Sequence, residues 1–188
     1  MKNAMKKNLI LLLTLILFSP LSAQVNGELD AKVLTKAHEM AKTFIAKDYE
    51  AFAKFSHPAV VKVMKGEKAM IQRLKKDFGE LESQGITFLE LKFSAPSKMI
   101  TVENELQCTI PQQIVMLVPG GTLTATTTVI AISEDQGNNW YFIDTAGNNV
   151  GNMKALIPSL SLDLPVPMPQ DPMFEPNEEE TTTPVAAP

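Results

Sequence analysis

The chain has 188 residues, of which 45% are hydrophobic and 20% are charged, which is the balance of a globular protein with one domain and some additional sequence. Its 17 Lys and Arg against 21 Asp and Glu give a net charge of -4, so charge offers no reason to expect nucleic-acid binding. Two His and one Cys leave little material for a metal site. The composition therefore predicts neither a metal nor a cofactor.

Residues 1–23 have the pattern of a secretory signal peptide. Three lysines precede an almost unbroken apolar run from Leu9 to Phe18, and small residues lead from there to Ala23. The run is shorter than the roughly 20 residues that a membrane span needs. We therefore expect cleavage near Ala23, export to the periplasm or out of the cell, and no membrane span in the mature chain. A retained N-terminal anchor is the alternative.

Three helices are expected after this segment. Residues 29–47 carry apolar residues at three- and four-residue spacing on one side. Asp48 is suited to cap a second, short helix, which should end at His57 because the residue before a proline is disfavoured in helical conformation. Residues 59–64 are a connector, either a short strand or a helical turn. The third helix covers residues 66–84, and its expected buried face is Met70, Ile71, Leu74, Phe78 and Leu81.

From Ile86 onward the apolar period changes to two, which is typical of strands. The turns that separate the strands contain Pro, Gly, Asn or Asp. Helices followed by an antiparallel meander predict an α+β fold. In the last strand, Tyr141 should point to the opposite side of the sheet from Trp140 and Phe142. The expected strands are residues 87–93, 99–110, 112–118, 122–133 and 139–144.

The composition changes after Val150. Eight of the 13 prolines fall between Pro158 and Pro188, and acidic residues outnumber basic ones there. Such a stretch buries too little apolar surface to offset the entropy of ordering it. We therefore expect a domain at residues 24–150 and a Pro-rich acidic tail at 151–188, largely disordered beyond about residue 165. Apolar residues suited to dock the first part of the tail on the domain are Leu156, Ile157, Leu160, Leu162 and Leu164.

Two stretches carry a resemblance to a known superfamily. Residues 44–52, FIAKDYEAF, form the step between the first two helices, and residues 137–144, GNNWYFID, form the last strand. With the order of elements, they resemble the nuclear transport factor 2-like (cystatin-like cone) superfamily over residues 29–145, above all its small exported bacterial members of unassigned activity. The resemblance implies N-terminal helices packed on a strongly bent antiparallel sheet with a cone-shaped cavity. Relatives include ketosteroid isomerase-like and SnoaL-like enzymes, and others that only bind a ligand or partner.

No residue set converges on one chemistry, so the candidate catalytic residues are single positions. Asp144, at the end of the last strand, is an acid or base if it faces a pocket, or a turn residue. His57 is a proton carrier in the cavity or a structural residue, and Tyr141 is a second polar group for either. Cys108 lies on the apolar side of its strand and is expected to be a buried, unreactive thiol. His38 is expected at the surface.

Two functions follow from these residues. The first is an exported, non-catalytic binding or interaction module that uses an apolar cavity or sheet face for a small apolar molecule or a protein partner. The alternative is a small lyase or isomerase of the ketosteroid isomerase or SnoaL-like kind, in which Asp144 works with Tyr141 or His57. Apolar residues on both sides of the later strands predict a homodimer that pairs through the sheet face. Glu90, Glu103 and Glu105 either face water or rim a concave face.

Overall fold

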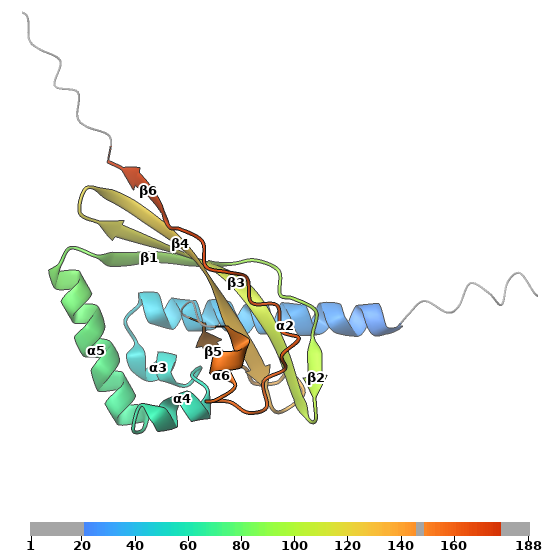
Figure 1. Ribbon diagram of the computed structural model, residues 1–188. Coiled ribbons are helices and arrows are strands. Elements are labelled where there is room, and N and C mark those ends of the chain that lie inside the picture. Colours follow the sequence, from blue (N-terminus) through green and yellow to red (C-terminus); the bar gives the residue numbers. More distant parts are fainter. Residues whose placement is uncertain (1–20, 146–148, 178–188) are drawn as a thin grey trace, which may run out of the picture.

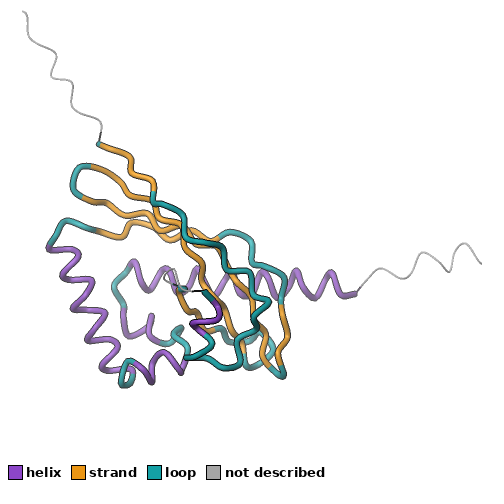
Figure 2. The backbone as a smooth tube through the Cα atoms, in the orientation of Figure 1, coloured by secondary structure: helices purple, strands orange, loops and turns teal. Residues whose placement is uncertain are grey.

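The computed structural model describes residues 21–145 and 149–177. Residues 1–20 of the predicted signal peptide and residues 178–188 of the predicted tail lie outside them. The fold is mixed α+β, with helices on the N-terminal side and a six-stranded antiparallel sheet, so the predicted class is confirmed (Figures 1 and 2). No helix in the described ranges is both long and apolar enough to cross a membrane.

Local sequence signals explain where the helices begin. The Asp48 carboxylate accepts a hydrogen bond from the Ala51 backbone N–H at 2.9 Å and caps α3, as predicted. The predicted connector after His57 is helical, because Pro58 fits the first helical position and the His57 side chain caps α4. The helices are α2 (Leu21–Ile45), α3 (Tyr49–Ala53), α4 (Pro58–Val63), α5 (Glu67–Ser83) and α6 (Val150–Met153).

The sheet differs from the prediction in two places: a turn at Glu103 and Asn104 divides the expected strand 99–110 into β2 and the start of β3, and the central strand is longer than expected. Residues 105–118 form one continuous strand that runs through Pro111, whereas we expected a break there. Pro111 is tolerated because it lies just past the last residue that pairs with β1, where the ladder needs no N–H donor from it. Its carbonyl accepts a hydrogen bond there from the Ser94 N–H. The strands are β1 (Thr87–Phe93), β2 (Ile100–Val102), β3 (Glu105–Val118), β4 (Gly121–Ser133), β5 (Tyr141–Asp144) and β6 (Met173–Pro176).

The strand order is β1-β3-β4-β5, with β2 added to β3 and β6 added to β4. β5 pairs with residues 129–132 of β4 and β6 with residues 121–124, so the two short strands follow each other along one edge. Between them, residues from Val150 to Leu164 pack on one face of the sheet. We call residues 149–172 the covering segment.

The sheet is buried on both faces, by different parts of the chain (Figure 1). On one face α2 supplies Val33, Ala37 and Met40, which pack on residues of β3 and β4. On the other face the covering segment supplies residues that pack on β4 and β5; these are Val150, Met153, Ile157, Leu160 and Leu164. The alternation in the sequence thus corresponds to two hydrophobic cores rather than one core and one wet face.

Buried polar side chains fix the covering segment to β3. The Gln107 carboxamide is fully buried; its Nε2 donates to the Ser159 carbonyl at 3.0 Å and its Oε1 accepts from the Ser161 N–H at 2.9 Å. The Thr109 hydroxyl donates to the Pro165 carbonyl at 3.0 Å. A chain segment that is rich in proline is therefore held by partners on the sheet in addition to the hydrogen bonds of its own helix and turns.

The ordered body extends beyond the domain boundary expected at residue 150. Ile157, Leu160 and Leu164 are buried, whereas Leu162 is 67% exposed, so docking uses only part of the predicted apolar set. β6 continues the sheet up to Pro176. It approaches β4 so closely that a Cβ on Gly121 would meet the Glu175 carbonyl and, at 2.8 Å, the Phe174 ring, which is why glycine occupies that position.

Replacing Gln107 by Met should destabilise the fold by about 1–3 kcal/mol, because the Ser159 carbonyl and the Ser161 N–H would lose their partner. The free energy of unfolding, measured with a chemical denaturant, tests this. Gln113→Met on the exposed side of the same strand is the matched control and should be nearly neutral. Equal stabilities of the two variants would contradict the proposed role of Gln107.

Candidate functional site

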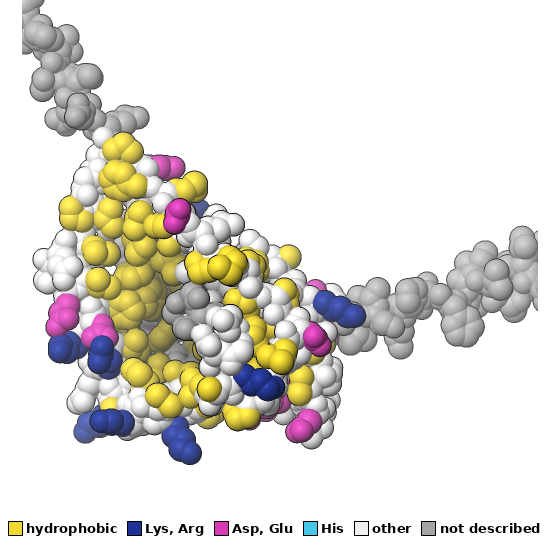
Figure 3. Space-filling view, viewed as in Figure 1, with side chains coloured by type: hydrophobic (Ala, Val, Ile, Leu, Met, Phe, Trp, Pro, Cys, Tyr) yellow, Lys and Arg dark blue, Asp and Glu magenta, His cyan; other side chains and the backbone are white. Residues whose placement is uncertain are grey.

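An apolar pocket of about 240 Å³ lies between the helices and the inner face of the sheet. In Figure 3 hydrophobic side chains gather over a hollow of the surface between α5 and the sheet. The pocket receives side chains from α2, α3 and α5 and from four strands. Its lining residues are Met40, Phe44, Phe52, Leu74, Phe78, Phe88, Leu91, Gln112, Ile114, Val129, Phe142 and Asp144.

Phenylalanine rings shape this pocket. Phe44 packs edge-to-face on Phe78 at 4.9 Å and on Phe88 at 5.1 Å between ring centroids, and Phe78 and Phe88 are 5.3 Å apart in the same manner. Tyr49 stacks on Phe78 at 5.9 Å and holds α5 against the start of α3. Because these rings brace one another, the apolar face of α5, apart from the buried Met70, stays half-buried and leaves space beside the sheet.

Gln112 is the buried polar group of the pocket, with 3% of its surface exposed. Its Nε2 donates to the Thr127 hydroxyl at 3.2 Å, across the β3–β4 pairing. Its Oε1 is buried and has no hydrogen-bond partner among the described residues. Such an unpaired acceptor costs about 1–3 kcal/mol, and a water-sized group in the pocket does not reach it, because the oxygen itself has almost no accessible surface.

Asp144 is the second polar group. It lines the pocket from the end of β5, on the same side as Phe142, and pairs in register with Val129. Its side chain is exposed, so the carboxylate lies at the mouth of the pocket rather than in its interior. Of the three candidate catalytic residues, Asp144 is the one that lines this pocket.

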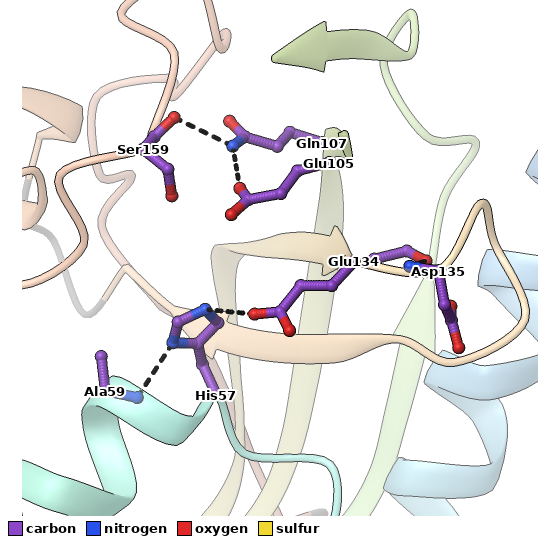
Figure 4. A network of polar contacts seen from close by, with 8 residues as sticks. His57, Ala59, Glu105, Gln107, Glu134, Asp135 and Ser159 are labelled. Atoms are coloured by element: carbon purple, nitrogen blue, oxygen red, sulfur yellow. Dashed lines mark hydrogen bonds and ion pairs between the residues drawn. The ribbon is translucent and has the colours of Figure 1, made fainter. Parts of the chain in front are cut away.

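His57 and Tyr141 lie together elsewhere. Their rings meet edge-to-face at 5.8 Å, on the side of β5 opposite to Phe142 and Asp144. Figure 4 shows His57 at the start of α4, directed toward Glu134 in the loop after β4. The structure therefore separates the residues that we expected to act with Asp144: alternation along β5 directs Tyr141 and Asp144 to different faces.

His57 has a structural role. Its Nδ1 accepts from the Ala59 N–H at 3.1 Å, so the proton of the neutral ring is on Nε2, which is 4.0 Å from Glu134 Oε1. Burial lowers the pKa of His57, and the carboxylates of Glu134 and Glu105 oppose that shift. A neutral, buried imidazole that caps a helix is better explained by a structural role of His57 than by a role as a proton carrier.

The other predicted residues lie apart from the pocket. Cys108 is fully buried, and this burial raises the pKa of its thiol to about 12, which accords with an unreactive residue. His38 is exposed and contacts Phe93. Glu90 and Glu103 face water, and Glu105 accepts from Gln107. Within the described ranges, no group of three or more His, Cys, Asp or Glu is placed to hold a metal ion.

Gln112 was missed in the sequence, although a signal for it exists. It follows Leu106, Cys108 and Ile110 at two-residue spacing and precedes Ile114, so it interrupts an apolar series on one face of a strand. We did not recognise this series because we expected one strand to end and another to begin at Pro111. A polar residue in such a place points to a buried hydrogen-bonding group.

Comparisons of the chain with protein-family models, with curated proteins and with solved structures found no match.

Protonation of His57 should destabilise the fold. Because burial lowers its folded-state pKa, the unfolded chain binds the proton more readily, and stability should fall as pH drops through the ordinary histidine range near about 6.5. His57→Asn retains a capping oxygen for the Ala59 N–H but cannot titrate. Denaturant unfolding between pH about 7.5 and about 5.5 should show a smaller loss in this variant. Equal losses would contradict the assignment.

Proposed function

We propose that this protein is a non-catalytic binding module that holds a small apolar molecule in the pocket between α2, α3, α5 and the sheet. The observation that carries the proposal is the apolar, aromatic-lined cavity itself, whose polar lining residues among those described are Gln112 and Asp144. Sites for small molecules are mostly apolar, with a few polar groups that orient the ligand. At about 240 Å³ the cavity lies just below the range of roughly 300–1,000 Å³ typical of drug-sized ligands, which favours a smaller one.

Export and superfamily membership belong to the same proposal. Support for the nuclear transport factor 2-like (cystatin-like cone) superfamily comes from helices that precede an antiparallel sheet, with an apolar pocket between them. A strongly bent sheet and a conical cavity are the finer form of that proposal. Support for export comes from the basic and apolar pattern of residues 1–23.

The lyase or isomerase alternative has weaker support. It needs a carboxylate and a second polar group within hydrogen-bond reach of one ligand atom. Asp144 lines the pocket, but Tyr141 and His57 lie on the other face of β5. This separation is our reason to propose binding without catalysis.

The homodimer stays a prediction with a narrower basis. Ile130 and Ile132, which motivated it, are covered by the chain's own covering segment. Exposed apolar residues that a second subunit would still cover lie at the far end of the β3–β4 hairpin and on β6; they are Leu117, Met173 and Phe174.

Native mass spectrometry of the protein purified from its own exported fraction tests the proposal. We expect a chain that begins at Gln24 and carries the added mass of one small molecule. Leu91→Trp should abolish the added mass, because the larger ring fills the pocket. Leu89→Trp on the same strand is the matched control; Leu89 is 48% exposed and outside the pocket lining, so the ligand should be retained.

The thermal stability of both variants should be measured as well, because overpacking costs about 1–3 kcal/mol even when the protein still folds. Loss of the added mass from a folded Leu91→Trp protein supports the pocket as the site. A folded Leu91→Trp protein that retains the molecule would place binding elsewhere and refute the proposal.

A further inference from the structure

The pocket opens onto an apolar surface along the hairpin of β3 and β4. Residues 106–133 contain no Asp, Glu, Lys, Arg or His, so nearly the whole hairpin is uncharged. The face of the hairpin that lines the pocket at Ile114 is apolar from there to the turn. We call the following residues of this face the apolar strip: Ile114, Met116, Val118, Leu123, Ala125 and Phe174.

The rest of the described chain covers the apolar strip only in part. Its residues on β3 and β4 are half-buried, Phe174 is 51% exposed, and none of the six belongs to either hydrophobic core. The opposite face of the same hairpin carries polar side chains, among them Gln113, Thr124 and Thr126. An antiparallel sheet normally gives its polar face to water and covers its apolar face. An apolar face that is left open in this way marks a binding surface.

The apolar strip is continuous with the pocket. Ile114 belongs to both, and Phe88, which lines the pocket, pairs in register with Met116. At the other end the Phe174 ring lies over Gly121, where a Cβ would approach it to 2.8 Å. Figure 3 shows hydrophobic side chains that continue from the hollow beside α5 toward the end of the molecule where Figure 1 places β6. Pocket and strip thus form one apolar site.

The dimensions of the apolar strip favour a narrow occupant. From Ile114 to Val118 it is about 13 Å long, and across β3, β4 and β6 it is about 14 Å wide. Its area is therefore about 200 Å², whereas a stable protein interface takes about 800 Å² from each partner. A flat protein surface would also leave the pocket unfilled. A second copy of the chain is thus a poorer fit than a slender ligand.

The apolar strip also lacks groups that would bind a peptide. The backbone of β3 from Gln112 to Leu117 is paired with β1 on one side and with β4 on the other. The remaining side of β4 at residues 121–124 is paired with β6. An added peptide strand would find no free backbone partner here, and its own polar groups would be buried without hydrogen bonds. An occupant without polar groups avoids this cost.

We infer that the ligand is a linear acyl or alkyl chain, whose end fills the phenylalanine-lined pocket and whose remainder lies along the apolar strip toward β6. This inference rests on the proposed binding function and adds the chemical class of the ligand. A flexible chain follows both a hollow and a sheet surface, so the pocket of about 240 Å³ needs to hold only one end of it. The polar head of the molecule lies beyond Phe174, in water.

Hexyl, octyl, decyl and dodecyl maltoside test this class, each used below the concentration at which it forms micelles. Isothermal titration calorimetry is done on the full protein, as the cell processes it and freed of retained ligand. Affinity should rise about fourfold for each methylene that enters the pocket. Along the apolar strip it should rise about twofold for each methylene, because one side of the chain stays in water. A ligand held by the pocket alone would gain nothing beyond octyl.

Variants on the two faces of β4 assign the gain to the apolar strip. Leu123→Glu places a charge on the strip and lies outside the pocket lining, so it should remove the gain from octyl to dodecyl and leave hexyl unchanged. Thr124→Glu, on the opposite face of the same strand, is the matched control and should keep the gain. Leu123→Ser adds no charge and should reduce the gain in a protein that tolerates the change more easily. Thermal unfolding verifies that each variant is folded.

The outcomes separate this inference from the proposed function. Equal affinities for octyl and dodecyl maltoside, or a folded Leu123→Glu protein that keeps the gain, would overturn the inferred ligand class and leave the binding pocket standing. Sedimentation tests the rival occupant: a dimer that Leu123→Glu dissociates and Thr124→Glu retains would also overturn it. Failure of every maltoside, together with a purified protein that carries no added mass, would overturn the binding function itself.

Discussion

Burial of β4 on both faces of the sheet is the constraint on which the rest of the structure depends. Alternate residues at its C-terminal end pack on α2 or on the covering segment, so that residues 128–133 are all buried. Neither α2 nor the covering segment could be removed without exposing one row of buried side chains of β4. The hydrogen bonds of Gln107 and Thr109 supplement this apolar packing. These hydrogen bonds fix the position of the covering segment, because they determine which of its residues meet β3.

The pocket exists because the helical layer covers the sheet unevenly. α2 packs directly on the central strands, whereas α5 is held away from them by the mutual contacts of Phe44, Phe78 and Phe88. Large rings that rest on one another cannot also fill the space beside β3. The same rings therefore provide both stability and an opening, and a buried polar side chain is located at that opening. The three residues Phe44, Phe78 and Phe88 therefore both stabilise the fold and shape the pocket.

The sequence predicted elements governed by local rules and missed features governed by contacts between distant residues. The Asp48 cap and the helical stripe with Val33 and Ala37 follow from local chemistry, and both are present. The continuous β3 was missed because the cost of Pro111 depends on where β1 ends. Docking of the first part of the tail was expected from its apolar residues, whereas the strand β6 was missed because the composition beyond residue 165 is that of a loose tail. Asp144 was correctly placed at the end of the last strand, and Pro58 is a local signal for a helix that starts at His57, but no local pattern could reveal that these two residues lie apart.

The hydrogen bonds that hold the covering segment join residues 52, 54 and 56 positions apart in the chain. Ribosomes add residues in order, so Ile130 and Ile132 are synthesised long before the residues that will cover them. Until then one row of β4 faces solvent, and pairings between distant residues form slowly. Such an exposed row is prone to aggregation during folding. Completion of the fold therefore waits for nearly the whole chain, and a nascent chain that stops short of Leu164 would be a substrate for chaperones or proteases.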